Sequence, residues 1–485
     1  MASILRRQAE RLGVLDHSRE ALARFGRSDA LVVVAGQQPG LFGGPLYTLT
    51  KALSAIALAR KAESASGKPV VPIFWVASDD HDFEEVRRTW ISDGGTEPHP
   101  LEVSADDAPP ATSFSRIRLG QGIGALLERV ESLLPGSEFR GATLDSLRGA
   151  YVPGRCWTEA FARFMAGFVT PLGALVFDPA DRDVKALALP IFEREIALSG
   201  KSSAAARDLG EALVRRGYHA QITRAGNELN LFLHRERRES VRVAEDGTFH
   251  LAGGGALRPE ELRAAIEERP EDVSAGVLLR PIFQDYLLPT AAYVGGPAEV
   301  AYWAQAYALY PLFDMAPPAV SPRAGATILE HRTAKTLERF GIDWRALAGD
   351  VEIAIANALR AFLPDDFQGA FDRERESWRQ SFGRLEEKVG SFDPSLKMAV
   401  ATAAGRVEHE SENLERKLMQ VWKRRHEESV HQIRRARGQL FPNGNLQERV
   451  YAPVGFAARY GTGFAARLGG ALGGPGEHAL VSLGG

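Results

Sequence analysis

A glycine-rich segment at residues 36–44 is the first place where this sequence could do chemistry. It follows an apolar run and leads into a helical pattern. Its glycines would let backbone N–H groups approach an anion, and the following helix would add partial positive charge at its N-terminus. The segment matches neither GxGxxG nor GxxxxGK(S/T). Phosphate or nucleotide binding and a plain tight connection between a strand and a helix are therefore equal alternatives.

An acidic segment with one histidine, Ser78-Asp79-Asp80-His81-Asp82, follows the next apolar run. A histidine titrates near neutral pH, and neighbouring carboxylates could orient it or bind an ammonium group or a metal ion. The alternative is a solvated helix start that is capped by aspartates. Because both segments follow strands of one parallel sheet, they share an edge of that sheet. A role in substrate binding is therefore as well supported as the structural one, and a metal site is less favoured.

Two later segments add polar residues to the same predicted edge. Residues 280–302 carry Arg280, Asp285 and Tyr302 in an apolar stretch, where buried polar groups need partners. Arg323 follows a short strand pattern and could hold a phosphate or a carboxylate in a forked pair. Taken alone, the first pattern favours core packing and the second favours a surface salt bridge.

The elements that must position these segments form an interrupted parallel sheet. Apolar runs at 30–35 and 70–77 flank a helical pattern from Pro45 to about Glu63. This order predicts a βαβ unit, and uninterrupted apolar runs are typical of strands buried on both faces. Further strands are predicted at 173–178, 276–280, 291–294 and 319–320, and a further helix at 298–309.

Two insertions are predicted to interrupt this sheet. The first lies between the second and third strands and carries one or two helices. The second is a small α+β piece in which 218–223 and 228–234 form a hairpin around residues 224–227.

The last third of the chain changes to long charged helices from about residue 333. Apolar residues recur at intervals of seven, as in a coiled coil. They are Phe371, Trp378, Leu385 and Phe392, and then Val400, Val407, Leu414 and Val421. Asp393-Pro394 predicts a turn between the two series, and the second helix is predicted to run without proline from 395 to 441. This pattern indicates an antiparallel helical hairpin, and such an arm more often serves dimerisation than catalysis.

The composition of the 485 residues excludes several classes of protein. The 59 basic and 62 acidic residues give a net charge of −3, which argues against a broadly basic surface for nucleic acid. One cysteine, Cys156, allows no intramolecular disulfide. The charged N-terminus is unlike a signal peptide, and no apolar run approaches the ~20 residues of a membrane helix. We expect a cytoplasmic protein that binds no membrane.

Five blocks of the sequence together resemble the bacillithiol biosynthesis cysteine-adding enzyme family. They are residues 36–52, 72–86, 284–305, 322–330 and 440–449, and they span essentially the whole chain in order. The sequence departs from the pattern at Asp79, where many relatives have Glu. The resemblance implies a cysteine ligase that joins the carboxyl group of cysteine to the amine of glucosaminyl-malate, the last step in making bacillithiol.

The resemblance also implies a fold. It is an α/β fold with a Rossmann-like parallel-sheet core similar to class I aminoacyl-tRNA synthetases, two connecting-peptide insertions and an antiparallel coiled coil for dimerisation. The predicted boundaries are 1–95 for the first part of the core, 96–170 for the first insertion, 171–200 for a core strand and helix, 201–272 for the second insertion, 273–335 for the last part of the core, 336–440 for the coiled-coil arm, and 441–485 for a segment that packs on the core or the arm.

The functional hypothesis is an amide-forming ligase that uses ATP or another nucleotide, with Mg²⁺ as an option and no tightly bound cofactor. Gln37 and Gln38 stand where the synthetases have histidines, so adenylate and acyl phosphate are both open as the activated form. We expect Asp80, His81 and Asp82 to be catalytic. Nucleotide binding is assigned to Gly36, Gln37, Gln38, Gly43, Gly44, Tyr47 and Arg323. Substrate binding is assigned to Gln284, Asp285, Gly296, Glu299 and Tyr302.

No metal site is assigned, and a homodimer formed through the coiled coil is expected. The alternatives are a nucleotidyltransferase-like enzyme that acts on another small molecule and a non-catalytic coiled-coil scaffold.

Overall fold

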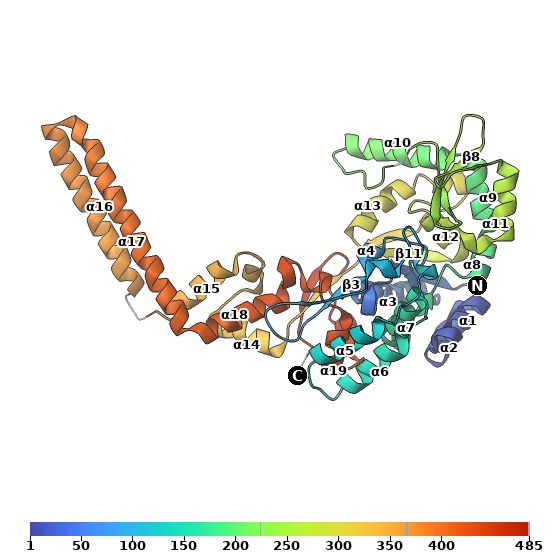
Figure 1. The fold of residues 1–485 in the computed structure, drawn as a ribbon, viewed down its shortest axis with the longest axis horizontal. Coiled ribbons are helices and arrows are strands. Elements are labelled where there is room, and N and C mark those ends of the chain that lie inside the picture. Colours follow the sequence, from blue (N-terminus) through green and yellow to red (C-terminus); the bar gives the residue numbers. More distant parts are fainter. Residues whose placement is uncertain (224, 364–366, 484–485) are drawn as a thin grey trace. The chain divides into compact units, whose positions relative to one another are not determined.

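The computed structural model describes residues 1–223, 225–363 and 367–483, and these form two compact units (Figure 1). The first unit comprises Met1–Asp93, Pro98–Leu329 and Leu446–Gly485. The second comprises Gly94–Glu97 and Glu330–Asn445.

A five-stranded sheet is the centre of the first unit, in the order β12-β11-β1-β2-β5. Every pair of neighbouring strands is parallel, which confirms the predicted α/β parallel sheet. The strands are β1 (Leu31–Gln37), β2 (Val70–Val76), β5 (Leu175–Phe177), β11 (Thr290–Gly295) and β12 (Ala319–Pro322).

Helices cover both faces of this sheet, which explains why its strands are uninterrupted apolar runs. In β2, Phe74 and Val76 pack on one face with residues of α3 (Tyr47–Ser66) and α7 (Trp157–Val169). Ile73 and Trp75 point to the other face. That face packs with residues of α1 (Ala2–Leu12), α9 (Leu189–Leu198) and α12 (Arg280–Leu287).

The strand order reverses between β1 and β11, because the chain moves from β1 toward β2 on one side and returns through β11 on the other. In open α/β sheets, ligands bind outside the carboxyl ends of the strands at such a reversal. Here α3 follows β1 and α13 (Pro297–Ala306) follows β11. The N-termini of both helices therefore lie at the edge of the sheet where a ligand is expected.

Two strand predictions are wrong, the first for a local reason and the second because of a distant side chain. Residues 276–280 lead through a turn into α12, because the backbone N–H groups of Leu279 and Arg280 bond to the carbonyl of Gly276, and Pro281 lies in the first turn of that helix. The strand ends earlier, as β10 (Val273–Ala275), and it belongs to the second sheet.

Residues 218–223 form no strand, because the side-chain amide of Gln305 bonds to both backbone groups of Ile222, at 2.8 and 2.9 Å. The predicted turn at 224–227 includes Arg224, which lies outside the described residues.

The second sheet is antiparallel and has the order β10-β6-β7-β8-β9. Its strands are β6 (Glu228–His234), β7 (Arg238–Val243), β8 (Phe249–Leu251) and β9 (Ala256–Leu257), besides β10. The helices that contact it are α9, α10 (Lys201–Arg215) and α11 (Pro259–Glu268), and α8 (Arg182–Leu187) precedes α9.

The stretch between β2 and β5 contains more helices than strands. It holds α4 (Phe83–Val86), the hairpin β3 (Arg88–Ile91) with β4 (His99–Glu102), then α5 (Ile123–Leu133), α6 (Arg140–Ala150) and α7. Cys156 precedes α7, and its Sγ lies 3.2 Å from the carbonyl oxygen of Ser115.

Three elements near the C-terminus return to the first unit. They are α19 (Pro453–Tyr460), α20 (Phe464–Gly470) and β14 (His478–Val481). The last of them pairs in parallel with β13 (Gly325–Ile328).

The second unit is helical and contains a long hairpin. Its helices are α14 (His331–Phe340), α15 (Val351–Arg360), α16 (Phe367–Phe392), α17 (Lys397–Arg425) and α18 (Glu427–Leu440). Ion pairs join Arg375 to Glu415 and Arg379 to Glu408, so residue numbers rise along α16 as they fall along α17. The predicted antiparallel hairpin is thus confirmed, and Asp393 caps its turn by accepting a bond from the Ser395 N–H at 2.8 Å.

The prediction of one continuous helix from 395 to 441 is wrong. The backbone leaves the helical region at His426, where φ is −115° and ψ is 33°. The His426 ring packs on Trp422 with centroids 4.2 Å apart, and its Nδ1 lies 3.0 Å from the Trp422 carbonyl oxygen. This local arrangement ends one helix and begins the next without a proline.

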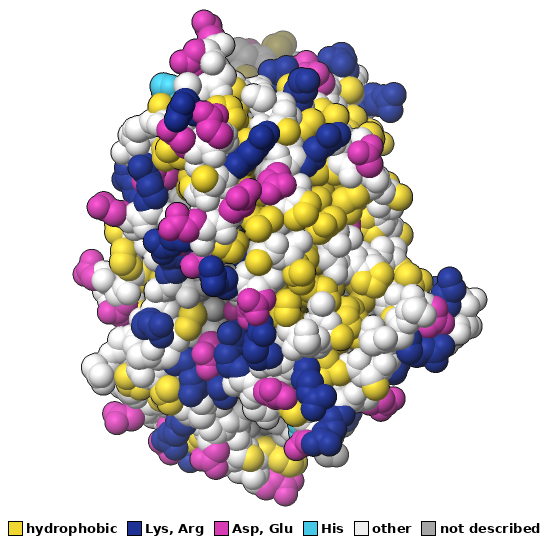
Figure 2. Space-filling model, turned by 90° about the vertical axis from the view of Figure 1, so that its right-hand side faces the viewer, with side chains coloured by type: hydrophobic (Ala, Val, Ile, Leu, Met, Phe, Trp, Pro, Cys, Tyr) yellow, Lys and Arg dark blue, Asp and Glu magenta, His cyan; other side chains and the backbone are white. Residues whose placement is uncertain are grey.

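The described helices include none with the length and apolar character needed to cross a membrane. On the face of the molecule shown in Figure 2, acidic and basic side chains are interspersed among hydrophobic ones. This mixture agrees with the net charge of −3.

Candidate functional site

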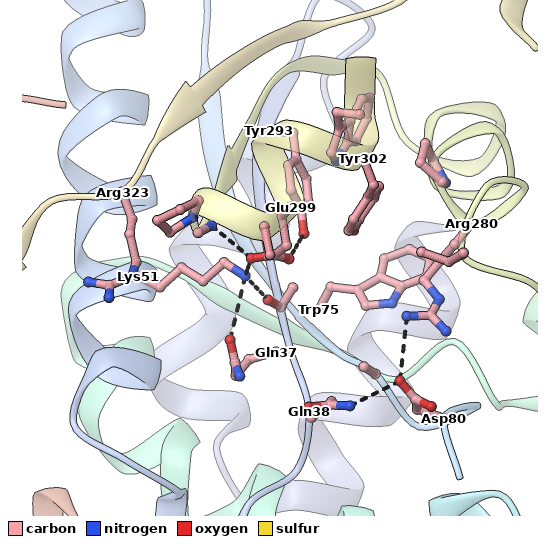
Figure 3. Close-up of a pocket in the computed structure, with 18 of the residues that line it drawn as sticks. Gln37, Gln38, Lys51, Trp75, Asp80, Arg280, Tyr293, Glu299, Tyr302 and Arg323 are labelled. Atoms are coloured by element: carbon pink, nitrogen blue, oxygen red, sulfur yellow. Dashed lines mark hydrogen bonds and ion pairs between the residues drawn. The ribbon is translucent and has the colours of Figure 1, made fainter. Parts of the chain in front are cut away.

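A cavity of about 520 Å³ opens in the first unit at the carboxyl ends of β1, β2 and β11 (Figure 3). It lies at the reversal of strand order, where the fold is expected to bind a ligand. Four of its lining residues carry cationic side chains and three carry carboxylates, all within the described part of the chain. They are Lys51, Arg280, Arg323 and Arg449, and Asp80, Glu85 and Glu299.

Lys51 joins the elements that meet at the reversal. It lies four residues after Tyr47 on α3, so both side chains lie on the same face of that helix. Its Nζ donates to the Glu299 carboxylate and to the Gly36 carbonyl, and lies 3.5 Å from Gln37 Oε1. Its side chain is only 2% exposed. Burial lowers the pKa of Lys51, and the charge of Glu299 opposes this effect.

Glu299 occupies the N-terminus of α13. Its Oε2 accepts a bond from the Gly296 N–H at 2.7 Å, and its Oε1 accepts one from the Tyr293 hydroxyl at 2.6 Å. Burial raises the pKa of Tyr293 well above its ordinary value, so this hydroxyl keeps its proton and donates. The partial positive charge at the N-terminus of α13 is thus already balanced by the Glu299 carboxylate.

Gln38 links two carboxylates on the other side of the cavity. Its Nε2 donates to Asp80 Oδ2 at 3.1 Å and to Glu85 Oε2 at 2.9 Å. Burial alone would raise the pKa of Asp80. The hydrogen bonds from His81 and Gln38 and the charge of Arg280, 3.9 Å away, outweigh it and hold that pKa well below its usual range. Asp80 is therefore a stable anion.

Arg323 forms a forked ion pair with Glu448. The two N–O distances are 3.0 and 2.8 Å, and the side chains are 8% and 3% exposed. The guanidinium also lies 5.3 Å from the ring of Tyr47. Arg449 differs from the other cavity cations, because its side chain has no ion-pair or hydrogen-bond partner among the described residues.

Most of the residues predicted for the site come together in this cavity. Those that line it are Gly36, Gln37, Gln38, Tyr47, Asp80, Gln284, Gly296, Glu299, Tyr302 and Arg323. Those that do not line it are Gly43, Gly44, His81, Asp82 and Asp285.

Gly43 and Gly44 serve the packing of the loop rather than the cavity. Both have positive φ, 93° and 68°, which favours glycine, and both are buried. A Cβ on Gly43 would lie 3.0 Å from Pro453 Cγ and 3.2 Å from a ring carbon of Phe164. The glycines thus allow close contact with the core and do not line the cavity, and their role in nucleotide binding stays a prediction.

Of the three polar residues predicted for the site that lie outside the cavity, His81 and Asp285 have other partners. His81 Nδ1 lies 3.2 Å from an Arg238 nitrogen, and Asp82 precedes α4. Asp285 accepts bonds from the Tyr310 hydroxyl and the Gln284 amide, and burial raises its pKa to about 6. The structure therefore brings only Asp80 of the three expected catalytic residues to the cavity.

Several lining residues were absent from the predicted set. Among them are Lys51, Trp75, Glu85, Arg280, Tyr293 and Arg449. The helical spacing from Tyr47 could have indicated Lys51, and Arg280 lies in a segment that the sequence does single out. Apart from their place in two of the five blocks, no feature of the sequence indicated that Glu85 and Arg449 belong to the site.

Comparison with known proteins gives matches over nearly the whole chain. Residues 1–324 match the N-terminal Rossmann-like domain of bacillithiol biosynthesis BshC, and residues 326–482 match its C-terminal coiled-coil domain. A relative from Salinibacter ruber is 33% identical over 95% of this chain and 84% of its own length. Relatives from Koribacter versatilis and Geobacillus kaustophilus are 32% and 30% identical, over 100% and 96% of this chain and 89% of their own lengths. All three are assigned as the cysteine ligase BshC.

Proposed function

Because this chain belongs to the bacillithiol biosynthesis BshC family, we propose that it is a cysteine ligase that makes bacillithiol. It joins the carboxyl group of cysteine to the amine of glucosaminyl-malate. The reaction takes place in the cavity at the reversal of strand order. The observation that carries this proposal is the polarity of that cavity.

The cavity offers both kinds of charge that the two substrates carry. Asp80 and Glu85 suit an ammonium group, which both cysteine and the amino sugar possess. Figure 3 shows Asp80 and Arg323 on opposite sides of the cavity, and Arg449 also lines it. The guanidinium of Arg449, which has no side-chain partner in the described part of the chain, suits a carboxylate of the malyl group or of cysteine. Substrates with an amine at one end and carboxylates at the other fit this arrangement.

Activation by ATP or another nucleotide, with or without Mg²⁺, is part of the proposal, because an amine and a carboxylate do not condense spontaneously in water. Only a few groups of the cavity are available to bind phosphates. Lys51, Arg280 and Arg323 are each paired with a carboxylate, and Glu299 occupies the N-terminus of α13. Among the described residues, the side chains left to contact an anion are Arg449 and the amide of Gln37, because the Gln38 amide donates to Asp80 and Glu85. Adenylate and acyl phosphate are both compatible with this set.

The likeness to class I aminoacyl-tRNA synthetases is a second part of the proposal. It is supported by the long stretches that separate β2 from β5 and β5 from β11, as connecting-peptide insertions do. The small-molecule substrates need no extended basic surface, which agrees with the net charge of −3.

The reaction is tested by incubating the purified protein with cysteine, glucosaminyl-malate and ATP. We expect formation of bacillithiol that requires all three. Release of AMP and pyrophosphate would indicate an adenylate, and release of ADP and phosphate an acyl phosphate. Pyrophosphate exchange that depends on another substrate and not on cysteine would contradict the proposal and favour a nucleotidyltransferase.

Dimerisation through the α16–α17 hairpin completes the proposal. Trp378 and Phe382 of α16 and Ala404 and Val407 of α17 line a small cavity between the two helices. Other heptad residues remain open to solvent, and Leu414 is 58% exposed. A second copy of the hairpin would cover them, as coiled coils bury their apolar positions.

Replacing Leu414 and Leu418 together with glutamate should therefore give a monomer in light scattering, because two charges would enter the apolar interface. Lys417→Glu, on the same helix but at an exposed polar position, should leave the dimer intact. A dimer that survives the double replacement would refute this interface.

A further inference from the structure

Glu85 differs from the other two carboxylates that line the cavity. Asp80 lies beside Arg280, and Glu299 is paired with Lys51. In the described part of the chain, Glu85 has no cationic partner, and the Gln38 amide is its hydrogen-bond donor. One carboxylate of the cavity is thus left without a fixed positive charge.

The surroundings of Glu85 favour its protonated form more than those of Asp80 do. Burial raises the pKa of Glu85, the Gln38 amide lowers it, and the negative charges of Asp80 and Asp82 raise it again, so that the net shift is upward. A general base works best when its pKa lies near the working pH, because it must be ionised and still hold a proton well. Asp80, whose pKa is lowered, meets this requirement poorly.

The geometry also separates the roles of the two carboxylates. Gln38 Nε2 is shared between them, so Asp80 and Glu85 lie on one side of the cavity. Asp80 can hold an ammonium group as a fixed anion. Glu85 belongs to α4 and is exposed to solvent, so a proton that it accepts can pass to water.

We propose that Glu85 is the general base that accepts a proton from the attacking amine of glucosaminyl-malate. This inference rests on the proposed function. In the step, the ammonium group gives one proton to a Glu85 oxygen, and the freed nitrogen lone pair attacks the activated carboxyl carbon of cysteine. The C–N bond forms, and the C–O bond to the phosphate or adenylate breaks, with its electron pair going to the leaving oxygen. The second proton leaves the nitrogen to water or the leaving phosphate.

The variant that tests this proposal is Glu85→Gln, which keeps the size of the side chain and an acceptor for Gln38. We expect bacillithiol formation at neutral pH to fall on the order of 10²-fold, within the usual range for a lost general base. Cysteine-dependent nucleotide consumption should persist, because activation precedes the step. The matched control is Glu84→Gln, since the neighbouring Glu84 is 65% exposed and pairs with Arg87 outside the cavity. It should retain the wild-type rate.

The pH dependence distinguishes a base from a structural residue. In the variant only the free amine reacts, so its deficit should shrink as the pH rises toward the pKa of that amine. The charged and titratable groups around Glu85 are Asp80, Asp82 and Tyr47, with Arg280 and Arg449 on the cavity wall, and all are unchanged in the variant.

A wild-type rate in Glu85→Gln, or a deficit that is equal at every pH, would overturn the assignment of Glu85. Wild-type protein that makes no bacillithiol would overturn the proposed function as well. The two failures are therefore distinguishable.

Discussion

Replacing Arg323 with methionine is expected to lower the free energy of unfolding by about 3–5 kcal/mol, the usual cost of removing one partner of a buried ion pair. The remaining Glu448 would be a buried carboxylate that has lost its forked partner, and it is only 3% exposed. One oxygen would keep the bond from the Ala326 N–H at 3.0 Å, which does not neutralise the charge.

A double variant isolates this cause. Adding Glu448→Gln to Arg323→Met removes the uncompensated charge and should recover much of the lost stability in urea denaturation. The control is Arg194→Met, because Arg194 and Asp314 form a solvent-exposed pair 3.8 Å apart, and such pairs contribute at most about 1 kcal/mol. A loss for Arg323→Met no larger than that of the control would contradict the expectation.

Replacing Lys51 with methionine is the second change with a large expected effect. We expect kcat/KM for bacillithiol formation to fall on the order of 10²-fold or more, about 3 kcal/mol of transition-state stabilisation. Lys51 bonds to Gly36 and Glu299 and lies beside Gln37, so its loss would release the cavity wall on both sides of the reversal. It is a positioning residue, and its charge is balanced by Glu299.

A second substitution, at Glu299, should affect the stability and the activity of the Lys51→Met variant differently. Glu299→Gln in the Lys51→Met background removes the unpaired charge of this half-buried side chain and should restore the free energy of unfolding, but not kcat/KM. Lys61→Met, an exposed position on the same helix, should change neither. Recovery of activity together with stability would show that Lys51 acts only through folding.

The parallel core could be predicted because its signal is local. The runs that became β1 and β2 are apolar without alternation, and a helical stripe separates them. One of the errors arose where a distant group decides the local structure. Residues 218–223 are alternating enough for a strand, but the amide of Gln305 takes up the backbone groups of Ile222.

The location of the site could be predicted, but not which of its side chains form ion pairs. Parallel strands present their carboxyl ends at one edge, so segments after β1, β2 and β11 had to converge. That Arg323 is paired with Glu448, or Lys51 with Glu299, depends on residues 125 and 248 positions apart. No spacing rule along the chain covers such distances. For the same reason His81, a plausible base in the sequence, turned out to face Arg238 outside the cavity.

Isotope labelling tests most directly whether this chain forms the amide bond of bacillithiol. The wild-type protein would be given ¹³C-labelled cysteine, glucosaminyl-malate with ¹⁵N in its amine, and ATP, and the thiol products would be weighed by mass spectrometry. We predict one product that carries both labels and is absent without the protein. If both substrates are recovered unreacted in the presence of ATP, or if the product carries only one label, this chain does not form that bond.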